Sequence, residues 1–378
     1  MKGKYIALIV AGAMMLAGAG ITFASIASHG FDFESIQSKG AETVEKEYPI
    51  SGSINDIIIE DAKVKISPAL GESYVKTVEL PKYTFDVKLE GGVLSVVGKN
   101  EMKWFDYPFA INEPEVVVYI PEGEYESLKI NNDSNSVVVE DGFIFGSAKV
   151  EDGSGSIKFY SDTTGDLVLH SGSGSVTVEG ASSGSMDVYA GSGSVKMRDI
   201  KTGNIGIKDS SGSIKLEGIE CADADIDSGS GGVTVSGIDA AGIKIKCSSG
   251  STHIEDGQFT GNVTVKSGSG SVNFRNVNAN SISTDSSSGS ENFINTIASE
   301  SFLVESGSGS VKLDRCDAQD IDINASSGSV NATLLTGKDF NASSGSGSVS
   351  LPDGDNMEIN GKMKVRAGSG SIRIQIAE

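Results

Sequence analysis

The chain has 378 residues, 48 of them glycine, and a formal net charge of −21 at pH 7. Nucleic acid needs a basic surface for its phosphates, so this charge argues against a nucleic-acid partner. The three cysteines, Cys221, Cys247 and Cys316, are widely spaced and form no CxxC or Cys/His grouping, which argues against a disulfide framework or a zinc site. We therefore expect each to be a small buried apolar residue.

Residues 1–28 are predicted to be a membrane anchor. Lys2 and Lys4 precede an uncharged stretch that runs from Tyr5 to Ser28, which is long enough to span a bilayer, where about 20 apolar residues are needed. Basic residues lie before this stretch and acidic residues after it, which predicts a single-pass cell-membrane protein whose C-terminal part is extracytoplasmic. The alternative is a cleavable signal peptide with a small-x-small cleavage site at residues 25–27.

Residues 29–49 are polar and irregular, and we interpret them as a stalk. Residues 50–130 contain short apolar runs separated by proline and glycine, but no clean repeat, which predicts a β-strand region that caps a repeat array. Trp104, Phe105 and Tyr107 form an aromatic cluster within it. We interpret this cluster as packed cap core, with a sugar-stacking binding surface as the alternative.

Residues 131–378 carry an internal repeat. The tripeptide Ser-Gly-Ser, or a close variant of it, recurs every 19 or 20 residues, with a last step of 23. A fixed period of this length is typical of stacked repeat architectures. Its central glycines are predicted to be structural turn residues with positive φ: Gly155, Gly174, Gly193, Gly212, Gly231, Gly250, Gly270, Gly289, Gly309, Gly328, Gly347 and Gly370.

Each repeat also holds two apolar pairs with one polar residue between the members, such as Val195/Met197 and Ile205/Ile207. This alternation predicts two main strands per repeat. The fold class is therefore all-β: a flattened parallel β-solenoid of about twelve coils, following one N-terminal transmembrane helix. A third apolar position is expected to fill the far turn, at Ile200, Ile219, Ile238, Val277, Ile297, Cys316 and Leu335.

The spacing of oppositely charged residues agrees with turns that stack in register. Asp223, Asp225 and Asp227 would share an outward face and suggest a calcium site. However, Lys244 and Lys246 lie 19 residues after two of them, so we favour ion pairs between neighbouring strands.

At the C-terminus, basic residues are expected to protect the exposed edge of the final coil from pairing with other strands: Lys362, Lys364, Arg366 and Arg373.

We find no catalytic motif, and we predict no enzyme activity, no cofactor and no metal site. His29, His170 and His253 are the only histidines, and none lies in a motif with serine or aspartate. The Ser-Gly repeats never form Gly-x-Ser-x-Gly and lack the Gly-Lys-Ser/Thr ending of a phosphate loop.

Several segments together resemble the bacterial putative-adhesin family, a β-strand-repeat domain of unknown function. They are the stalk at 29–33, the strand at 116–121, the segment at 127–130 and the Ser-Gly-Ser-Val ladder. The resemblance implies a Gram-positive envelope protein, as in membrane-anchored proteins of Lia-type cell-envelope stress responses. It supplies no catalytic residues.

The sequence thus favours a membrane-anchored extracytoplasmic solenoid that acts as a non-enzymatic surface binding or adhesion module. Cell-wall or surface glycans and envelope proteins are the expected partners. One alternative is a structural spacer or scaffold of the envelope, and another is a carbohydrate-active β-helix enzyme.

Overall fold

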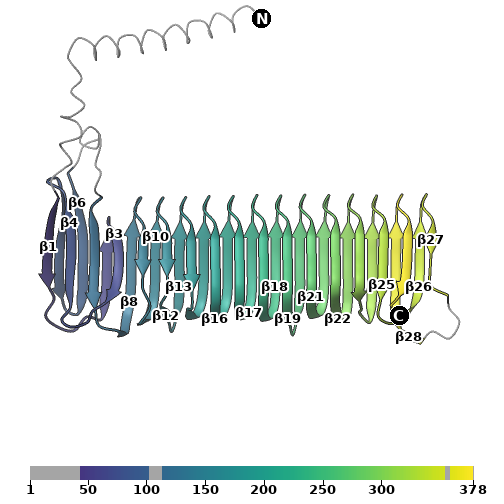
Figure 1. The fold of residues 1–378 in the computed structure, drawn as a ribbon, viewed down its shortest axis with the longest axis horizontal. Helices are drawn as coiled ribbons and strands as arrows, with labels where there is room; N and C mark the ends of the chain where they lie inside the picture. Colours follow the sequence, from purple (N-terminus) through teal and green to yellow (C-terminus); the bar gives the residue numbers. More distant parts are fainter. Residues whose placement is uncertain (1–42, 102–112, 354–357, 378) are drawn as a thin grey trace, which may run out of the picture.

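The computed structural model describes residues 43–101, 113–353 and 358–377, which form strands and turns without a helix (Figure 1). Within these ranges no helix is long and apolar enough to cross a membrane. The predicted anchor at 1–28 lies outside them. The strands are β1 (Val44–Pro49), β2 (Asp56–Glu60), β3 (Lys63–Pro68), β4 (Tyr74–Glu79), β5 (Tyr83–Glu90), β6 (Val93–Asn100), β7 (Glu115–Ile120), β8 (Gly123–Asn132), β9 (Val137–Val139), β10 (Phe143–Asp152), β11 (Ile157–Phe159), β12 (Asp162–Thr163), β13 (Asp166–Ser171), β14 (Val176–Glu179), β15 (Ser182–Ala190), β16 (Val195–Asp209), β17 (Ile214–Ser228), β18 (Val233–Cys247), β19 (Thr252–Phe259), β20 (Asn262–Ser267), β21 (Val272–Ser286), β22 (Glu291–Ser306), β23 (Val311–Cys316), β24 (Asp320–Ala325), β25 (Val330–Leu334), β26 (Gly337–Ser344), β27 (Val349–Ser350), β28 (Ile359–Ala367) and β29 (Ile372–Ile376).

The predicted parallel β-solenoid is confirmed. We call the turn that contains Ser-Gly-Ser the glycine corner and the turn at the other end of each coil the far corner. The segment after the glycine corner belongs to the first sheet, and the segment before it belongs to the second. Neighbouring turns pair in parallel: Val195 lies beside Ile214 in the first sheet, and Ile207 lies beside Ile226 in the second.

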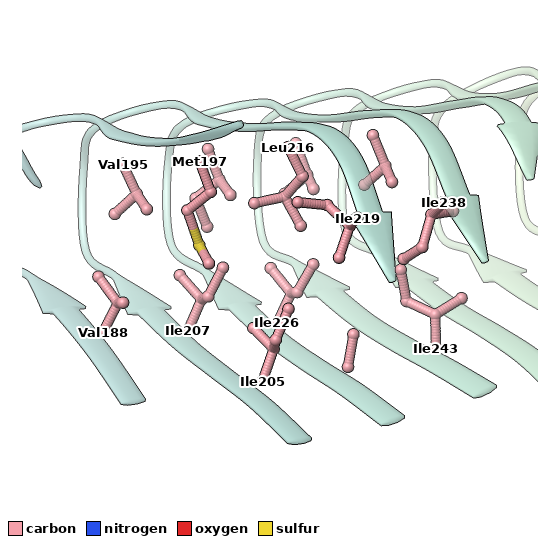
Figure 2. Packing of buried hydrophobic residues seen from close by; sticks show 14 of the residues in the cluster. Val188, Val195, Met197, Ile205, Ile207, Leu216, Ile219, Ile226, Ile238 and Ile243 are labelled. Atoms are coloured by element: carbon pink, nitrogen blue, oxygen red, sulfur yellow. The ribbon is translucent and has the colours of Figure 1, made fainter. Parts of the chain in front are cut away.

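The apolar pairs of the two sheets point toward each other and form one continuous core (Figure 2). Met197, Leu216 and Ile226 have no exposed surface. Burying one such side chain stabilises the fold by about 1.5–3 kcal/mol. Because each turn is sandwiched between two others, most of this burial comes from neighbouring turns.

The solenoid has about 13 turns, one more than the glycine ladder predicts. The additional turn contains β9, which pairs with β11 and β3. At its glycine corner stands Asn135, whose carbonyl lies beneath Gly155. A search for Ser-Gly-Ser could not find a turn in which asparagine replaces the glycine.

The far corner holds a third inward position, as expected, in most turns. Ile200, Ile219 and Ile238 are stacked there and buried. Ile297 and Leu335, by contrast, are 40% and 42% exposed. Their assignments are wrong by one residue: the side chains that point inward are those of their neighbours, Thr296 and Leu334.

The steps of 20 residues are accommodated near the far corner. Ala279 pairs with Ala298, but two residues later Ser281 pairs with Ser301, so one extra residue is looped out of the register. Both sheets therefore keep their alignment, and the outward columns of side chains stay unbroken on either side of the insertion.

The twelve glycines lie at the glycine corner, but the expected reason for them is wrong. None of them has positive φ. Each instead lies directly over the carbonyl group of the equivalent residue one turn away, so that a Cβ on Gly231 would overlap the carbonyl oxygen of Gly212. Glycine is required here by close approach of two backbones.

A small polar side chain lies inside the glycine corner and forms hydrogen bonds with its backbone. Ser228 Oγ donates to the carbonyl oxygen of Gly231 at 2.7 Å, and the Cys247 thiol makes the same bond to Gly250 at 2.9 Å. At the equivalent position in another turn, Asp209 accepts hydrogen bonds instead of donating them. Its Oδ1 accepts from the amides of Ser211 and Gly212. Backbone groups of the turn are thereby satisfied.

The positive φ values occur at the far corner instead. The residue in this conformation recurs in eight successive turns, as Gly180, Asp199, Gly218, Gly237, Asp256, Asn276, Asn295 and Arg315. Glycine, asparagine and aspartate tolerate it best. Arg315, which does not, donates from Nε to Asn295 Oδ1 at 2.8 Å, and Asn295 in turn donates to Asn276. This side-chain ladder holds the arginine in place.

All three cysteines are free and buried, as predicted. Burial raises the pKa of Cys221 and of Cys316 to about 11, so both stay protonated at neutral pH.

The N-terminal end of the solenoid is closed by antiparallel strands. β2 lies between β6 and β8, and β3 lies between β7 and β9. Beyond them, β4 pairs with β7, β1 pairs with β4, and β5 pairs with β6, all antiparallel. Leu80, Tyr83 and Phe85 are buried there.

At the other end, the last strands in sequence are not the last in space. β28 lies between β24 and β26, and β29 lies between β25 and β27, so the terminal turn is made by β26 and β27. The expectation that the basic residues Lys362, Lys364, Arg366 and Arg373 guard an exposed edge is therefore wrong, because their strands are paired on both sides. The steps of 19 residues on either side of Gly328 gave no sign that the chain skips a turn there.

A buried ion pair connects the segments around the place where β28 and β29 lie between earlier strands. Lys338 Nζ lies 2.6 Å from Asp317 Oδ1, and the lysine side chain has no exposed surface. It also donates to Thr336 Oγ1 at 2.9 Å and to the carbonyl oxygen of Asn360 at 2.5 Å. The ammonium thus joins the corner after β23, the start of β26 and the return to β28.

One core position carries a carboxyl group. Glu291 occupies the inward place that Val272 and Val311 hold in the adjoining turns and is 1% exposed. Neither carboxyl oxygen has a partner in good hydrogen-bond geometry, and the nearby hydroxyl of Thr284 offsets only part of the effect of burial on the pKa. Burial raises the pKa of Glu291 to about 7.

Replacing Gly231 by alanine should lower the free energy of unfolding by about 1–3 kcal/mol, the usual cost of forcing atoms into packed structure. The added Cβ would overlap the carbonyl of Gly212. Thermal unfolding followed by circular dichroism measures the change. Gly71→Ala is the matched control, because a Cβ there meets nothing within 4 Å. A Gly231→Ala variant as stable as the wild type would contradict the close-stacking assignment.

Glu291→Gln should stabilise the protein increasingly as pH rises. The folded-state pKa of about 7 exceeds the ordinary value of 4.5, so the native carboxyl keeps a proton that the unfolded one releases. The penalty is absent below pH 4.5 and complete above pH 7, where it reaches about 3 kcal/mol. Unfolding of both proteins across this range measures it, with the exposed Glu305→Gln as control. A gap between wild type and variant that does not widen with pH would refute the assignment.

Candidate functional site

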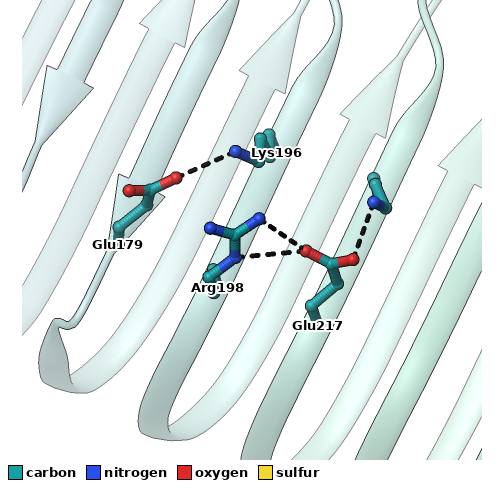
Figure 3. A network of polar contacts seen from close by, with 5 residues as sticks. Glu179, Lys196, Arg198 and Glu217 are labelled. Atoms are coloured by element: carbon teal, nitrogen blue, oxygen red, sulfur yellow. Dashed lines mark hydrogen bonds and ion pairs between the residues drawn. The ribbon is translucent and has the colours of Figure 1, made fainter.

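The outer face of the first sheet carries ion pairs between its own side chains (Figure 3). Glu179 accepts from Lys196 at 3.0 Å, and Glu217 accepts from Arg198 and Lys215 at 3.0 and 2.6 Å. The bond from Lys196 lowers the pKa of Glu179, and the bonds from Lys215 and Arg198 lower that of Glu217. Exposed pairs of this kind contribute little to stability. Along these turns they neutralise the charges that a ligand site could otherwise use.

The outer face of the second sheet is hollowed. In β16, Gly206 occupies the outward position that Asp187 holds in β15 and Asp225 holds in β17. Because glycine has no side chain, a shallow hollow of about 580 Å³ opens there, and it is lined also by Tyr189 and Lys208.

An aromatic pair forms one wall of this hollow. Tyr189 and His170 lie side by side on β15 and β13, with ring centroids 4.3 Å apart and planes at 70°. The tyrosine remains 38% exposed. An edge-to-face arrangement of this kind fixes the orientation of the tyrosine ring.

A second hollow of about 670 Å³ continues the first along the solenoid axis and shares Asp225 and Lys244 with it. Gly242 and Gly261 line it. Together the two hollows form a groove across the second-sheet segments of β13, β15, β16, β17, β18 and β20, which we call the second-sheet groove. Lys244 Nζ lies 2.9 Å from Asp225 Oδ2, as the in-register charge pattern predicted.

The second-sheet groove can offer an aromatic ring, carboxylates and ammonium groups to a ligand that lies along the surface. The Asp225 side chain is 61% exposed and bonded to Lys244. Among the residues that the structure describes, no three histidine, cysteine or acidic side chains gather as metal ligands.

The residues singled out from sequence fall elsewhere. Trp104, Phe105 and Tyr107 lie outside the described ranges, and the twelve turn glycines lie at the glycine corner, away from the groove. His253 stands on the first sheet, 3.5 Å from Glu255. The groove was missed, although a glycine in an outward strand position beside an aromatic residue is a signal that the aligned repeats contain.

Comparison with known proteins identifies one family. The Toastrack DUF4097 family matches residues 54–203, 184–268 and 258–378, and these overlapping matches cover the solenoid from β2 to its end. No curated protein matches the chain.

Several solved structures are similar to it. A putative lipid binding protein from Parabacteroides distasonis shares 17% identity over 67% of this chain and 97% of its own, with a TM-score of 0.37. A putative adhesin from the same organism shares 16% identity over 67% and 96%, with a TM-score of 0.40. A putative adhesin from Bacteroides fragilis shares 14% identity over 67% and 97%, with a TM-score of 0.34.

Proposed function

We propose that this chain, which belongs to the Toastrack DUF4097 family, is a non-enzymatic binding module that holds an extended, hydroxyl-rich polymer in the second-sheet groove. The observation that supports this proposal is the groove itself, where outward glycines open a sheet whose neighbouring positions carry side chains. Cell-wall and surface glycans are polymers of this chemistry.

The shape of the groove favours a polymer over a small molecule. Pockets for small ligands bury most of the ligand surface, whereas these hollows are open to solvent along their length. The exposed ring of Tyr189 provides an apolar surface for the C–H face of a sugar, and the carboxylate of Asp187 can accept hydrogen bonds from hydroxyl groups.

Display outside the cytoplasm is part of the proposal. It rests on the basic residues before the apolar stretch at 5–28 and on the acidic residues after it. In that arrangement the N-terminal segment anchors the protein in the cell membrane and the solenoid extends into the cell envelope. A role in envelope stress follows only from the family resemblance.

Tyr189→Ala and Gly206→Val should each weaken binding of the protein to isolated cell-wall polysaccharide at least tenfold. The first removes the aromatic surface and the second fills the hollow, where only the mobile end of Asp187 must move. Sedimentation of the protein with insoluble wall material measures binding. Leu303→Ala is the matched control, because Leu303 is equally exposed, at 38%, on the same sheet outside the groove. Equal binding by all four proteins would refute the groove as the site.

A spacer is the second candidate, favoured by the unbroken stack of glycine corners and by the paired charges of the first sheet. Deleting residues 195–232 removes two turns from the middle of the groove, with Gly206 and Asp225, whereas deleting residues 272–310 removes two turns outside it. If the groove binds, only the first deletion should abolish wall binding. If length alone matters, the two deletions should have equal effects on the wall association of cells that carry them.

A further inference from the structure

The apolar core is exposed to different extents at the two ends of the solenoid. At the C-terminal end, Val349 and Leu351 are each 41% exposed, although Ile372, beside Val349 in the next turn inward, is 1% exposed. Phe340 and Ala342 of β26 are likewise only partly buried. At the N-terminal end, by contrast, antiparallel strands cover the core. The terminal turn thus leaves an apolar layer half open to water.

The longer edge strand of this turn, β26, has no outward lysine or proline to deter pairing, whereas β27 is only two residues long. Natural edges carry outward lysines, prolines or bulges. From Asp339 onward β26 is regular, and its exposed side chains are those of Asp339, Asn341 and Ser343. Lys338, the one lysine of β26, is buried in its ion pair. The N-terminal edge strand β1, in contrast, exposes three successive charges, Glu45, Lys46 and Glu47.

Whatever covers this end must supply two strands at once. β26 extends the second sheet and β27 extends the first, and packed sheets lie about 10 Å apart. A single extended peptide would pair with one strand and leave the other half of the core open. The end of a second solenoid presents two strands at the required separation.

We propose that two copies of this chain pair end to end through β26 and β27, related by a twofold axis perpendicular to both sheets. The axis would pass through the central outward residues, so that Asn341 meets the partner's Asn341 and Ser350 meets the partner's Ser350. Strand directions then oppose, and both sheets continue as antiparallel ladders across the junction.

Side chains match under this symmetry. Phe340 lies opposite the partner's Ala342 and Val349 opposite the partner's Leu351, so each inward pair joins one larger and one smaller apolar group. Asp339 faces the partner's Ser343, which keeps like charges apart. The contact is isologous, so both chains use the same surface and the assembly closes at two chains.

The dimer places the two N-terminal ends at the far ends of a rod of doubled length, since β1 and β27 lie at opposite ends of one chain (Figure 1). If the N-terminal segments anchor the chains, as proposed above, the pair joins two membranes. This consequence rests on the proposed anchoring, whereas the pairing itself does not.

Sedimentation equilibrium of the full chain in detergent, over a range of micromolar concentrations, tests the pairing. The wild type should pass from monomer to dimer, and Asn341→Lys combined with Ser350→Lys should remain monomeric, because two lysines would meet their copies at the axis. The matched control is Ser283→Lys combined with Asn331→Lys, which adds the same charge in the same outward columns on interior turns. It should dimerise like the wild type.

Oxidative cross-linking gives a second readout that does not depend on charge. Asn341→Cys should form a disulfide between two chains, because directly opposed antiparallel residues have Cα atoms about 4.5–5.5 Å apart, within disulfide range. Asn331→Cys should not, and the three native cysteines are buried. A wild type that stays monomeric, a dimer that survives the paired lysines, or equal cross-linking at both positions would overturn the proposal. Wall binding through Tyr189 should be the same in every one of these variants.

Discussion

The contact on which the structure depends is the close approach of one backbone turn to the next at the glycine corner. Each glycine lies over the carbonyl group of its equivalent, as Gly174 does over Gly155 and Gly193 over Gly174, with no room for a Cβ between them. This contact fixes the register, and the register places every inward apolar pair over its neighbours and every outward side chain in a column. The core, the ion-pair face and the groove all depend on it.

The sequence predicted the fold because the period of 19 or 20 residues and the alternation of apolar residues are both visible without coordinates. It could not reveal which corner needs positive φ, since Gly231 and Gly237 are the same residue type in one turn and differ only in their backbone surroundings. It also could not reveal the insertion of β28 and β29, because parallel pairing depends on the period and not on chain order.

The candidate site was not predicted for a related reason, although the aligned repeats contain its signal. A groove in a β-solenoid arises where an outward column lacks a side chain, as at Gly206, and where the neighbouring column supplies a partly exposed ring, as at Tyr189. Both residues are unremarkable alone. Only the alignment of turns shows that they lie beside each other, and only coordinates show that the first sheet pairs its charges along the same turns where the second sheet is hollowed.

Hydrogen–deuterium exchange by mass spectrometry tests the turn-by-turn stacking most directly, because the order in space and the order in sequence differ at the C-terminus. Amides of β28 and β29 are in strands paired on both sides, whereas β26 and β27 are paired on one. In the monomeric Asn341→Lys, Ser350→Lys variant, where no second chain covers β26 and β27, we expect slower exchange in residues 359–376 than in residues 339–350, although the former are nearer the chain end. Faster exchange in residues 359–376 than in residues 339–350 would contradict the turn-by-turn stacking.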